Sequence, residues 1–181
     1  MESKLKSSEY LDSVCLEIVG LHFLKEELED SVKLILSSSI VLTMGNGGSA
    51  STAQHLAQGL CDAGIPSICL SDNTSLITAI ANDIGYNDIF LRQVELFKTK
   101  KVSIIAISVS GKSPNIIAAV DRARVLGIKT IGLIGFNEES LLKDFVDIPI
   151  VVSSKDFGVV EDCHLVISHL ICRMVKESYG N

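Results

Sequence analysis

The chain has 181 residues, of which 47% are hydrophobic and 21% charged, and its formal net charge is −6. This length and composition suit one globular domain and exclude a disordered chain. The negative charge argues against nonspecific binding of nucleic acid or of anionic membranes, because both need a positively charged surface. An anionic ligand must therefore be held locally, by backbone amides, hydroxyl groups or a metal.

No apolar run approaches the length of a membrane span, and the N-terminal stretch lacks the apolar centre of a signal peptide. The cysteines are odd in number and include no C-x-x-C pair; they are Cys15, Cys61, Cys69, Cys163 and Cys172. Reduced thiols are the simpler account of such a set. We therefore expect a cytoplasmic protein with no membrane partner.

The first expected element is a helix from about Tyr10 to Leu36. Apolar residues recur there at a spacing of three and four, with acids and lysines on the other faces. A break near Gly20 would divide this stretch into two helices. Such a segment either lies on the domain's own sheet or packs against a partner chain.

A glycine-rich loop, Gly45–Ser49, follows the expected strand Ile40–Met44 and precedes a helical pattern from Ala50. Glycine permits positive φ angles and the close approach of a ligand, and a helix N-terminus favours an anion such as phosphate. Two other interpretations stay open at this point. The loop also fits a dinucleotide fingerprint with Asp72 as the ribose acid, and a plain strand-to-helix turn would use the same residues.

Strands and helices alternate through the rest of the chain. Short apolar runs predict strands at Ser67–Leu70, Val102–Ile107, Thr130–Ile134 and Ile148–Val152. Helices are expected over Leu76–Ile80, Ile89–Phe97, Asn115–Leu126, Leu141–Phe145 and Val159–Ser178, and a loop over Asn82–Asp88. Continuous apolar strands separated by helices predict a parallel sheet with helices on both faces. Ligands of such α/β sheets bind beyond the carboxyl ends of the strands.

A second polar loop follows the strand Val102–Ile107 and supplies three hydroxyl groups, from Ser108, Ser110 and Ser113. Pro114 then suits the first position of a helix. A capped helix start needs only one serine. Three serines at a helix N-terminus favour a phosphate monoester held by hydroxyls and amides, and weaken the dinucleotide interpretation.

At this point the sequence resembles the sugar isomerase (SIS) family, and within it the phosphoheptose isomerases. The segments that carry the resemblance are Gly45–Ala50 through Ala53–His55, Thr78–Asp83, Ile107–Asn115, Gly127–Gly135 and the last helix around His164 and His169. They cover nearly the whole chain, in the family's order and spacing.

The resemblance implies a three-layer α/β/α sandwich with a five-stranded parallel sheet, as a single domain over residues 1–181. Residues 1–37 would be an N-terminal helical assembly segment and residues 38–181 the α/β core. It implies a homotetramer with active sites between subunits. The implied activity converts sedoheptulose 7-phosphate into D-glycero-D-manno-heptose 7-phosphate for bacterial lipopolysaccharide or capsule, and several members of the family carry zinc.

The resemblance also assigns roles to residues of this chain. The phosphosugar would contact Asn46, Gly47, Gly48, Ser49, Asn82, Asp83, Ser108, Val109, Ser110, Ser113 and Glu161. His55 and His169 fall on metal positions, and His169 also falls on the catalytic base. Moving a carbonyl between neighbouring carbons needs a base for the carbon-bound proton and an acid for the oxygen. A bound Zn²⁺ can stabilise the charge that develops on those oxygens.

Two positions depart from the family. A glutamate that acts as ligand and general acid/base is replaced by Gly59, and a ligand glutamine is replaced by Glu161. The hypothesis from these two changes is that the carboxylate has moved, so that Glu161 joins His55 and His169 as a catalytic group and zinc ligand. Eight residues separate Glu161 from His169, about 12 Å along a helix, so this set requires Glu161 to lie at a frayed helix start.

An alternative from a different class is a noncatalytic SIS module, similar to the family's protein that associates with the replication initiator. The loss of the usual glutamate fits that class. The two histidines at metal positions argue for chemistry, because a binding module does not need them. His164, five residues before His169, is expected to be a packing residue that faces elsewhere.

Overall fold

The computed structural model describes residues 7–98, 101–136 and 140–179. Its centre is a five-stranded parallel sheet with the strand order β2-β1-β3-β4-β5. The strands are β1 (Ile40–Gly45), β2 (Ser67–Cys69), β3 (Val102–Ser108), β4 (Lys129–Ile134) and β5 (Ile148–Val151). The α/β/α class predicted from the alternation of strands and helices is confirmed.

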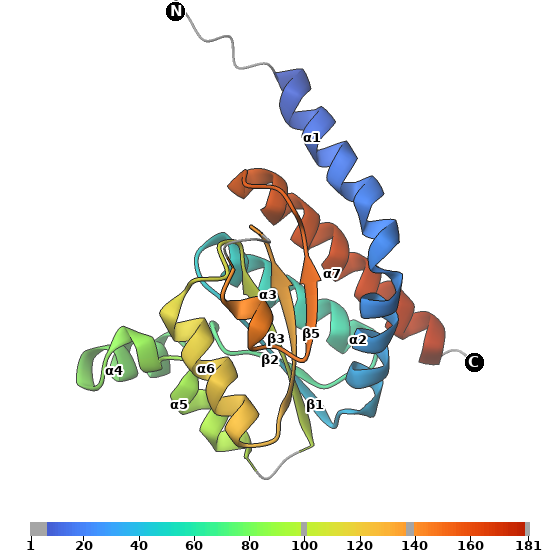
Figure 1. Ribbon diagram of the computed structural model, residues 1–181. Coiled ribbons are helices and arrows are strands. Elements are labelled where there is room, and N and C mark those ends of the chain that lie inside the picture. The colour runs from blue at the N-terminus through green and yellow to red at the C-terminus, as the bar shows by residue number, and fades with distance from the viewer. Residues whose placement is uncertain (1–6, 99–100, 137–139, 180–181) are drawn as a thin grey trace, which may run out of the picture.

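The helices form a layer on each face of the sheet (Figure 1). They are α1 (Ser7–Gly20), α2 (Lys25–Ser37), α3 (Gly48–Asp62), α4 (Thr74–Asp83), α5 (Leu91–Val94), α6 (Pro114–Val125) and α7 (Phe157–Tyr179). Short 3-10 turns occupy Leu21–Leu24, Tyr86–Asp88, Glu95–Phe97 and Leu142–Asp144. Helices α2, α3 and α7 pack on one face, and α4, α5 and α6 on the other.

The alternation of side chains along each strand divides the core into two halves. In β1, Val41 joins the half formed with α2, α3 and α7, whereas Leu42 joins the half formed with α4, α5 and α6. Both side chains are fully buried. A parallel sheet covered on both faces requires such continuous apolar strands, so the fold follows directly from the sequence pattern.

The N-terminal segment breaks where Gly20 suggested, at the 3-10 turn that separates α1 from α2. Helix α2 lies on the chain's own sheet, with Leu28, Val32 and Ile35 buried in the core. Helix α1 instead extends beyond the body of the molecule (Figure 1). It contacts α7, and Tyr10, near the N-terminal end of α1, donates a 2.6 Å hydrogen bond from its hydroxyl to Asp162 of α7. The hydrogen bond to the ionised carboxylate raises the pKa of Tyr10 to about 12.

Two expected boundaries are wrong in ways that matter for the site. Asn82 and Asp83 were expected in a loop, but they form the last turn of α4. Helix α7 begins at Phe157, two residues before the expected start, so Glu161 lies inside a regular helix and not in its first turn. All five cysteines are free thiols. Within the described ranges, no helix combines the length and the hydrophobicity that crossing a membrane requires.

His164 is buried in α7 with only 1% of its surface exposed, and neither of its ring nitrogens has a hydrogen-bond partner. Burial lowers the pKa of His164 from 6.5 to about 4, although the nearby backbone of Ile134 opposes part of this change. The folded protein therefore holds this imidazole neutral. Its expected role as a packing residue agrees with this position.

We predict that the folded state loses stability as the pH falls from about 6.5 to about 4, because the unfolded chain binds a proton that buried His164 refuses. The loss attributable to His164 is at most about 3 kcal/mol. Urea unfolding at several pH values measures it. His164→Leu should flatten this part of the pH profile, whereas His22→Gln, on an exposed side chain, should leave it unchanged. If the stability of His164→Leu falls with pH as steeply as that of the wild type, the prediction is contradicted.

Candidate active site

The first loop of the site joins the carboxyl end of β1 to the N-terminus of α3. Gly47 precedes the helix at a φ of 55°, a conformation that favours glycine. Gly45 is constrained differently, since a Cβ there would lie 2.4 Å from the backbone oxygen of Ser49. The backbone therefore leaves no room for a side chain at Gly45, and the loop presents the unpaired amides of the α3 N-terminus to a ligand.

The second loop joins the carboxyl end of β3 to α6. The Ser108 hydroxyl accepts a hydrogen bond from the Gly111 amide at 3.1 Å, and the Ser110 hydroxyl accepts one from the Lys112 amide at 3.2 Å. Ser113 occupies the N-cap position of α6, but its hydroxyl makes no capping hydrogen bond and lies 3.4 Å from the Ser108 hydroxyl. The Ser113 side chain is thus not explained by helix capping.

The two loops meet in a cavity of about 160 Å³. Its lining residues are Asn46, Ser49, Ile107, Ser108, Val109, Ser110, Ser113, Phe157 and Glu161. Helices α3 and α6 both begin beside it, so two helix N-termini favour an anion there. Six of the predicted contact residues line this cavity together with Glu161, and its size and donors suit a phosphate group.

Four predicted contact residues do not line the cavity. Gly47 and Gly48 stay within the first loop and the start of α3. Asn82 and Asp83 end α4, where the Asn82 amide donates to the Asp83 carboxylate at 2.8 Å. Figure 1 shows α4 extending away from the sheet. The described residues of a single chain do not bring these two side chains to the cavity.

Helices α3 and α7 run side by side and carry the remaining predicted residues. At one end, a Cβ on Gly48 would meet the Glu161 carboxylate oxygen at 2.4 Å. About two turns further along both helices, the Nε2 atoms of His55 and His169 lie 2.8 Å apart. Both histidine side chains are exposed. The structure therefore pairs the two predicted metal histidines and places Glu161 beside the phosphate cavity.

The proposed three-residue metal set is not assembled in one chain. Within the described residues, no group of three His, Cys, Asp or Glu side chains lies close enough to hold a metal ion. Glu161 sits in regular helix, about 12 Å along α7 from His169. The condition attached to this set, a frayed helix start, is not met, although zinc binding itself stays a prediction.

Gly59, where the family has its glutamate, lies one turn after His55 and faces α7. A Cβ at this position would lie 2.8 Å from the Cys172 sulfur. Burial and the charge of Asp62 raise the pKa of the Cys172 thiol to about 11, so this sulfur is a neutral packing group. A glutamate at position 59 would have to displace it.

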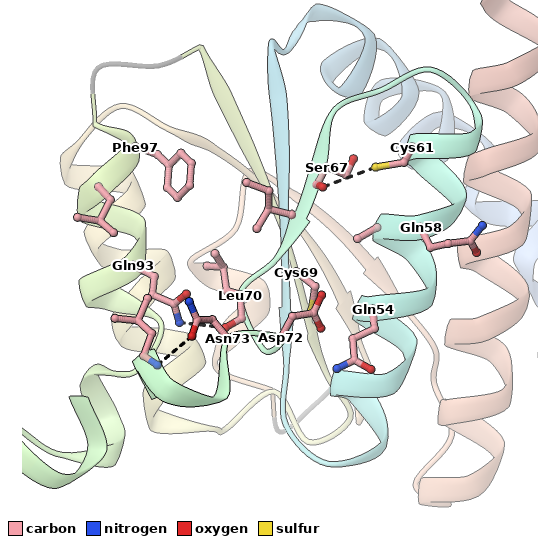
Figure 2. A pocket seen from close by; sticks show the side chains of 14 residues that line it. Gln54, Gln58, Cys61, Ser67, Cys69, Leu70, Asp72, Asn73, Gln93 and Phe97 are labelled. Carbon is pink, nitrogen blue, oxygen red and sulfur yellow. Dashed lines mark hydrogen bonds between the residues drawn. The ribbon is translucent and has the colours of Figure 1, made fainter. Parts of the chain in front are cut away.

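A larger cavity, of about 490 Å³, lies at the edge strand β2, between α3 and α5 (Figure 2). Gln54, Gln58 and Cys61 line it from α3, and Phe97 from the opposite side. Gln93 does not offer its amide to this space, because the amide nitrogen already donates to the Leu70 and Ile89 carbonyls. The larger cavity holds none of the predicted catalytic groups.

Comparison with known proteins identifies the family. A model of the SIS domain matches residues 24–135. The chain is 37% identical to the phosphoheptose isomerase of Helicobacter pylori (strain P12) over 172 residues, 90% of this chain and 89% of the relative. It is 40% identical to that of Trichlorobacter lovleyi over 160 residues, 85% and 80% of the two chains. The chain belongs to the SIS domain family, in its phosphoheptose isomerase group.

Solved structures agree with this assignment. A phosphoheptose isomerase from Francisella tularensis superposes with a TM-score of 0.90 at 29% identity, covering 98% of this chain and 100% of the other. Phosphoheptose isomerase from Neisseria gonorrhoeae gives 0.87 at 26% identity, covering 94% and 96%. The fold predicted from the alternation of strands and helices is confirmed, and so is the family predicted from the resemblance.

We predict that Ser113→Ala weakens phosphosugar binding about tenfold or more, because a hydrogen bond to a charged group is worth about 1.5–3 kcal/mol. Calorimetric titration with sedoheptulose 7-phosphate measures it. Ser37→Ala is the matched control, since that serine caps the end of α2 through the Leu34 carbonyl and lies outside the site. If Ser113→Ala and the wild type bind sedoheptulose 7-phosphate with equal affinity, Ser113 does not contact the phosphate.

Proposed function

We propose that this protein is a phosphosugar aldose–ketose isomerase that converts sedoheptulose 7-phosphate into D-glycero-D-manno-heptose 7-phosphate for bacterial heptose biosynthesis. The observation that carries this proposal is the cavity in which the serine loop, the glycine loop and Glu161 meet beside two helix N-termini. The relationship to phosphoheptose isomerases along nearly the whole chain supports the same substrate.

The distance between the cavity and the histidine pair suits a long sugar. The Gly48–Glu161 contact borders the cavity, and the His55–His169 contact lies about 10 Å further along the two helices. In a heptose 7-phosphate, the phosphate and the reacting carbons lie at opposite ends of the carbon chain. Such a molecule can place its phosphate on the two loops and extend its carbonyl end toward the histidines.

The reaction transfers one proton between neighbouring carbons and another between their oxygens. We assign His169 as the base that removes the carbon-bound proton, because the family resemblance places the base there and an imidazole nitrogen that holds no metal can accept a proton. Glu161 lines the phosphate cavity and binds substrate hydroxyls there. Glu161 belongs to α7, but its carboxylate lies beside Gly48 at the start of α3. The positive end of the α3 dipole therefore stabilises its negative charge.

The histidine pair fits a divalent metal such as zinc. Two nitrogens on one tetrahedral zinc lie about 3.3 Å apart, so the 2.8 Å between these two Nε2 atoms needs only a small rotation of exposed rings. A bound zinc would supply electrostatic stabilisation of negative charge on the substrate oxygens. His55 and His169 would hold it, with a further ligand from a partner subunit, because Glu161 lies about 12 Å along α7 from His169.

The decisive experiment is proton NMR of the purified protein with sedoheptulose 7-phosphate, with and without added zinc. We expect conversion by the wild type. His169→Ala should abolish it, and His55→Ala should lower bound zinc and activity together. Glu161→Gln should lower activity, because the amide keeps the shape of the side chain and loses its charge. A wild-type protein that binds the sugar and never converts it would favour the noncatalytic binding module.

The missing family glutamate has its own test. Gly59→Glu alone would collide with the Cys172 sulfur, so the informative variant is Gly59→Glu combined with Cys172→Ala. Cys172→Ala alone is the matched control. If Glu161 has taken over the role of the family's glutamate, the double variant should be little more active than Cys172→Ala alone. A double variant that gains activity over an inert wild type would identify a disabled isomerase.

We further propose a cytoplasmic homotetramer with active sites between subunits. Helix α1 carries large apolar side chains that its own chain leaves exposed: Leu11 at 61%, Leu16 at 72%, Val19 at 60% and the following Phe23 at 87%. Apolar surface of this kind is typical of an interface. Reduced cysteines and a phosphorylated substrate favour the cytoplasm.

We expect sedimentation of the wild type at micromolar concentration to give a species larger than a monomer. Leu16→Glu combined with Phe23→Glu should shift it toward the monomer, because charges would enter an apolar interface. Ser13→Glu, on the same exposed helix, is the control for added charge. A stable wild-type monomer would overturn the proposed assembly and the shared active site.

A further inference from the structure

The side chain of Asn46, in the glycine loop, makes three hydrogen bonds within the protein. Its Nδ2 donates to Asn115 Oδ1 at 2.9 Å, and its Oδ1 accepts from Asn115 Nδ2 at 2.9 Å. The same Oδ1 accepts a third hydrogen bond, at 3.1 Å, from the hydroxyl of Tyr86. These bonds fill the acceptor sites of Oδ1 and use one of the two Nδ2 hydrogens, so Asn46 is held in place from two other segments.

Asn115 ties the two phosphate loops together. It is the second residue of α6, directly beyond the serine loop, and its side chain is only 1% exposed. A buried amide must be hydrogen-bonded, and the reciprocal pair with Asn46 satisfies both of its ends at once. Because Asn46 leads into α3 and Asn115 begins α6, this pair fixes the two helix N-termini relative to each other.

Tyr86 adds a third segment to the same point. It lies in the 3-10 turn Tyr86–Asp88, three residues after Asp83, and its hydroxyl reaches Asn46. Its side chain is 57% exposed, so little of the core depends on it. The hydroxyl bond therefore connects the segment that carries Asn82 and Asp83 to the glycine loop.

We propose that Asn115 and Tyr86 are positioning residues, which hold Asn46 so that the glycine loop binds the substrate phosphate through backbone amides. The side chain of Asn46 then links the glycine loop to the start of α6 and to the turn that carries Tyr86. This inference rests on the proposed phosphosugar function. It assigns roles to two residues that composition and motif spacing left without one.

A double-mutant cycle tests the inference, with affinity for sedoheptulose 7-phosphate measured by calorimetry, and with kcat and KM measured by NMR. Tyr86→Phe removes one hydroxyl and keeps the ring, so the fold should be preserved. Losing one net hydrogen bond should raise Kd and KM about threefold to tenfold with little change in kcat. Thr78→Val is the control, since its exposed hydroxyl bonds only within α4.

The second arm repeats Tyr86→Phe in an Asn46→Ala background. If Tyr86 acts through Asn46, the substitution should have no further effect there. An equal loss in both backgrounds would mean that Tyr86 binds the sugar directly, and would overturn the inference. Asn115→Ala provides a second background in case Asn46→Ala folds poorly. In that background, Tyr86→Phe should still raise Kd and KM only if Asn46 remains in place.

The outcomes separate this inference from the proposed function. If the wild type binds and converts the sugar while Tyr86→Phe matches it in Kd and KM, the positioning role is wrong and the isomerase stands. If the wild type binds neither sedoheptulose 7-phosphate nor inorganic phosphate, the phosphosugar function fails and the positioning role fails with it. A lowered melting temperature for Tyr86→Phe with unchanged KM would indicate a purely structural bond and would also overturn the inference.

Discussion

The site depends on the close parallel contact between α3 and α7. Two glycines make this contact possible, since a Cβ on Gly48 would meet Glu161 and a Cβ on Gly59 would meet Cys172. Between them, His55 and His169 touch through their ring nitrogens. Because α3 and α7 run side by side, they hold the cavity at their start and the histidine pair further along at a fixed distance from each other. A rigid pair of helices is what a reaction at one end of a long substrate requires.

Much of the fold could be predicted from the sequence because each element carries its own local signal. Apolar runs marked the strands, and the glycine loop and Pro114 marked where two of the helices begin. The break at Gly20 was visible for the same reason. The serine loop was also readable, because three hydroxyls exceed what capping a helix needs. Local chemistry and local structure agree at these positions, as expected of a sequence that specifies one fold.

The remaining features arise from contacts between distant segments, which no local pattern encodes. Asn82 and Asp83 resembled a loop, yet the helix continues through them. Glu161 was expected near the start of the last helix. Its position beside Gly48 depends on α3, more than a hundred residues earlier in the chain. Asn46 is predicted to contact the phosphosugar, and no local pattern showed that its side chain also bonds to Asn115 and Tyr86. A polar residue in a glycine loop can bind a substrate or hold the loop, and only tertiary structure distinguishes the two.

The carboxylate question can be argued further from the same helix pair. A glutamate at position 59 and a large side chain at position 172 compete for one space, so a glycine at 59 permits the sulfur of Cys172 to pack there. A charge lost from that position is not replaced nearby, since Glu161 lies at the other end of the contact. The two histidines nevertheless remain exposed and paired at 2.8 Å, an arrangement that packing does not require. A binding module has no need of two exposed histidines at the predicted metal positions, so their presence favours retained chemistry.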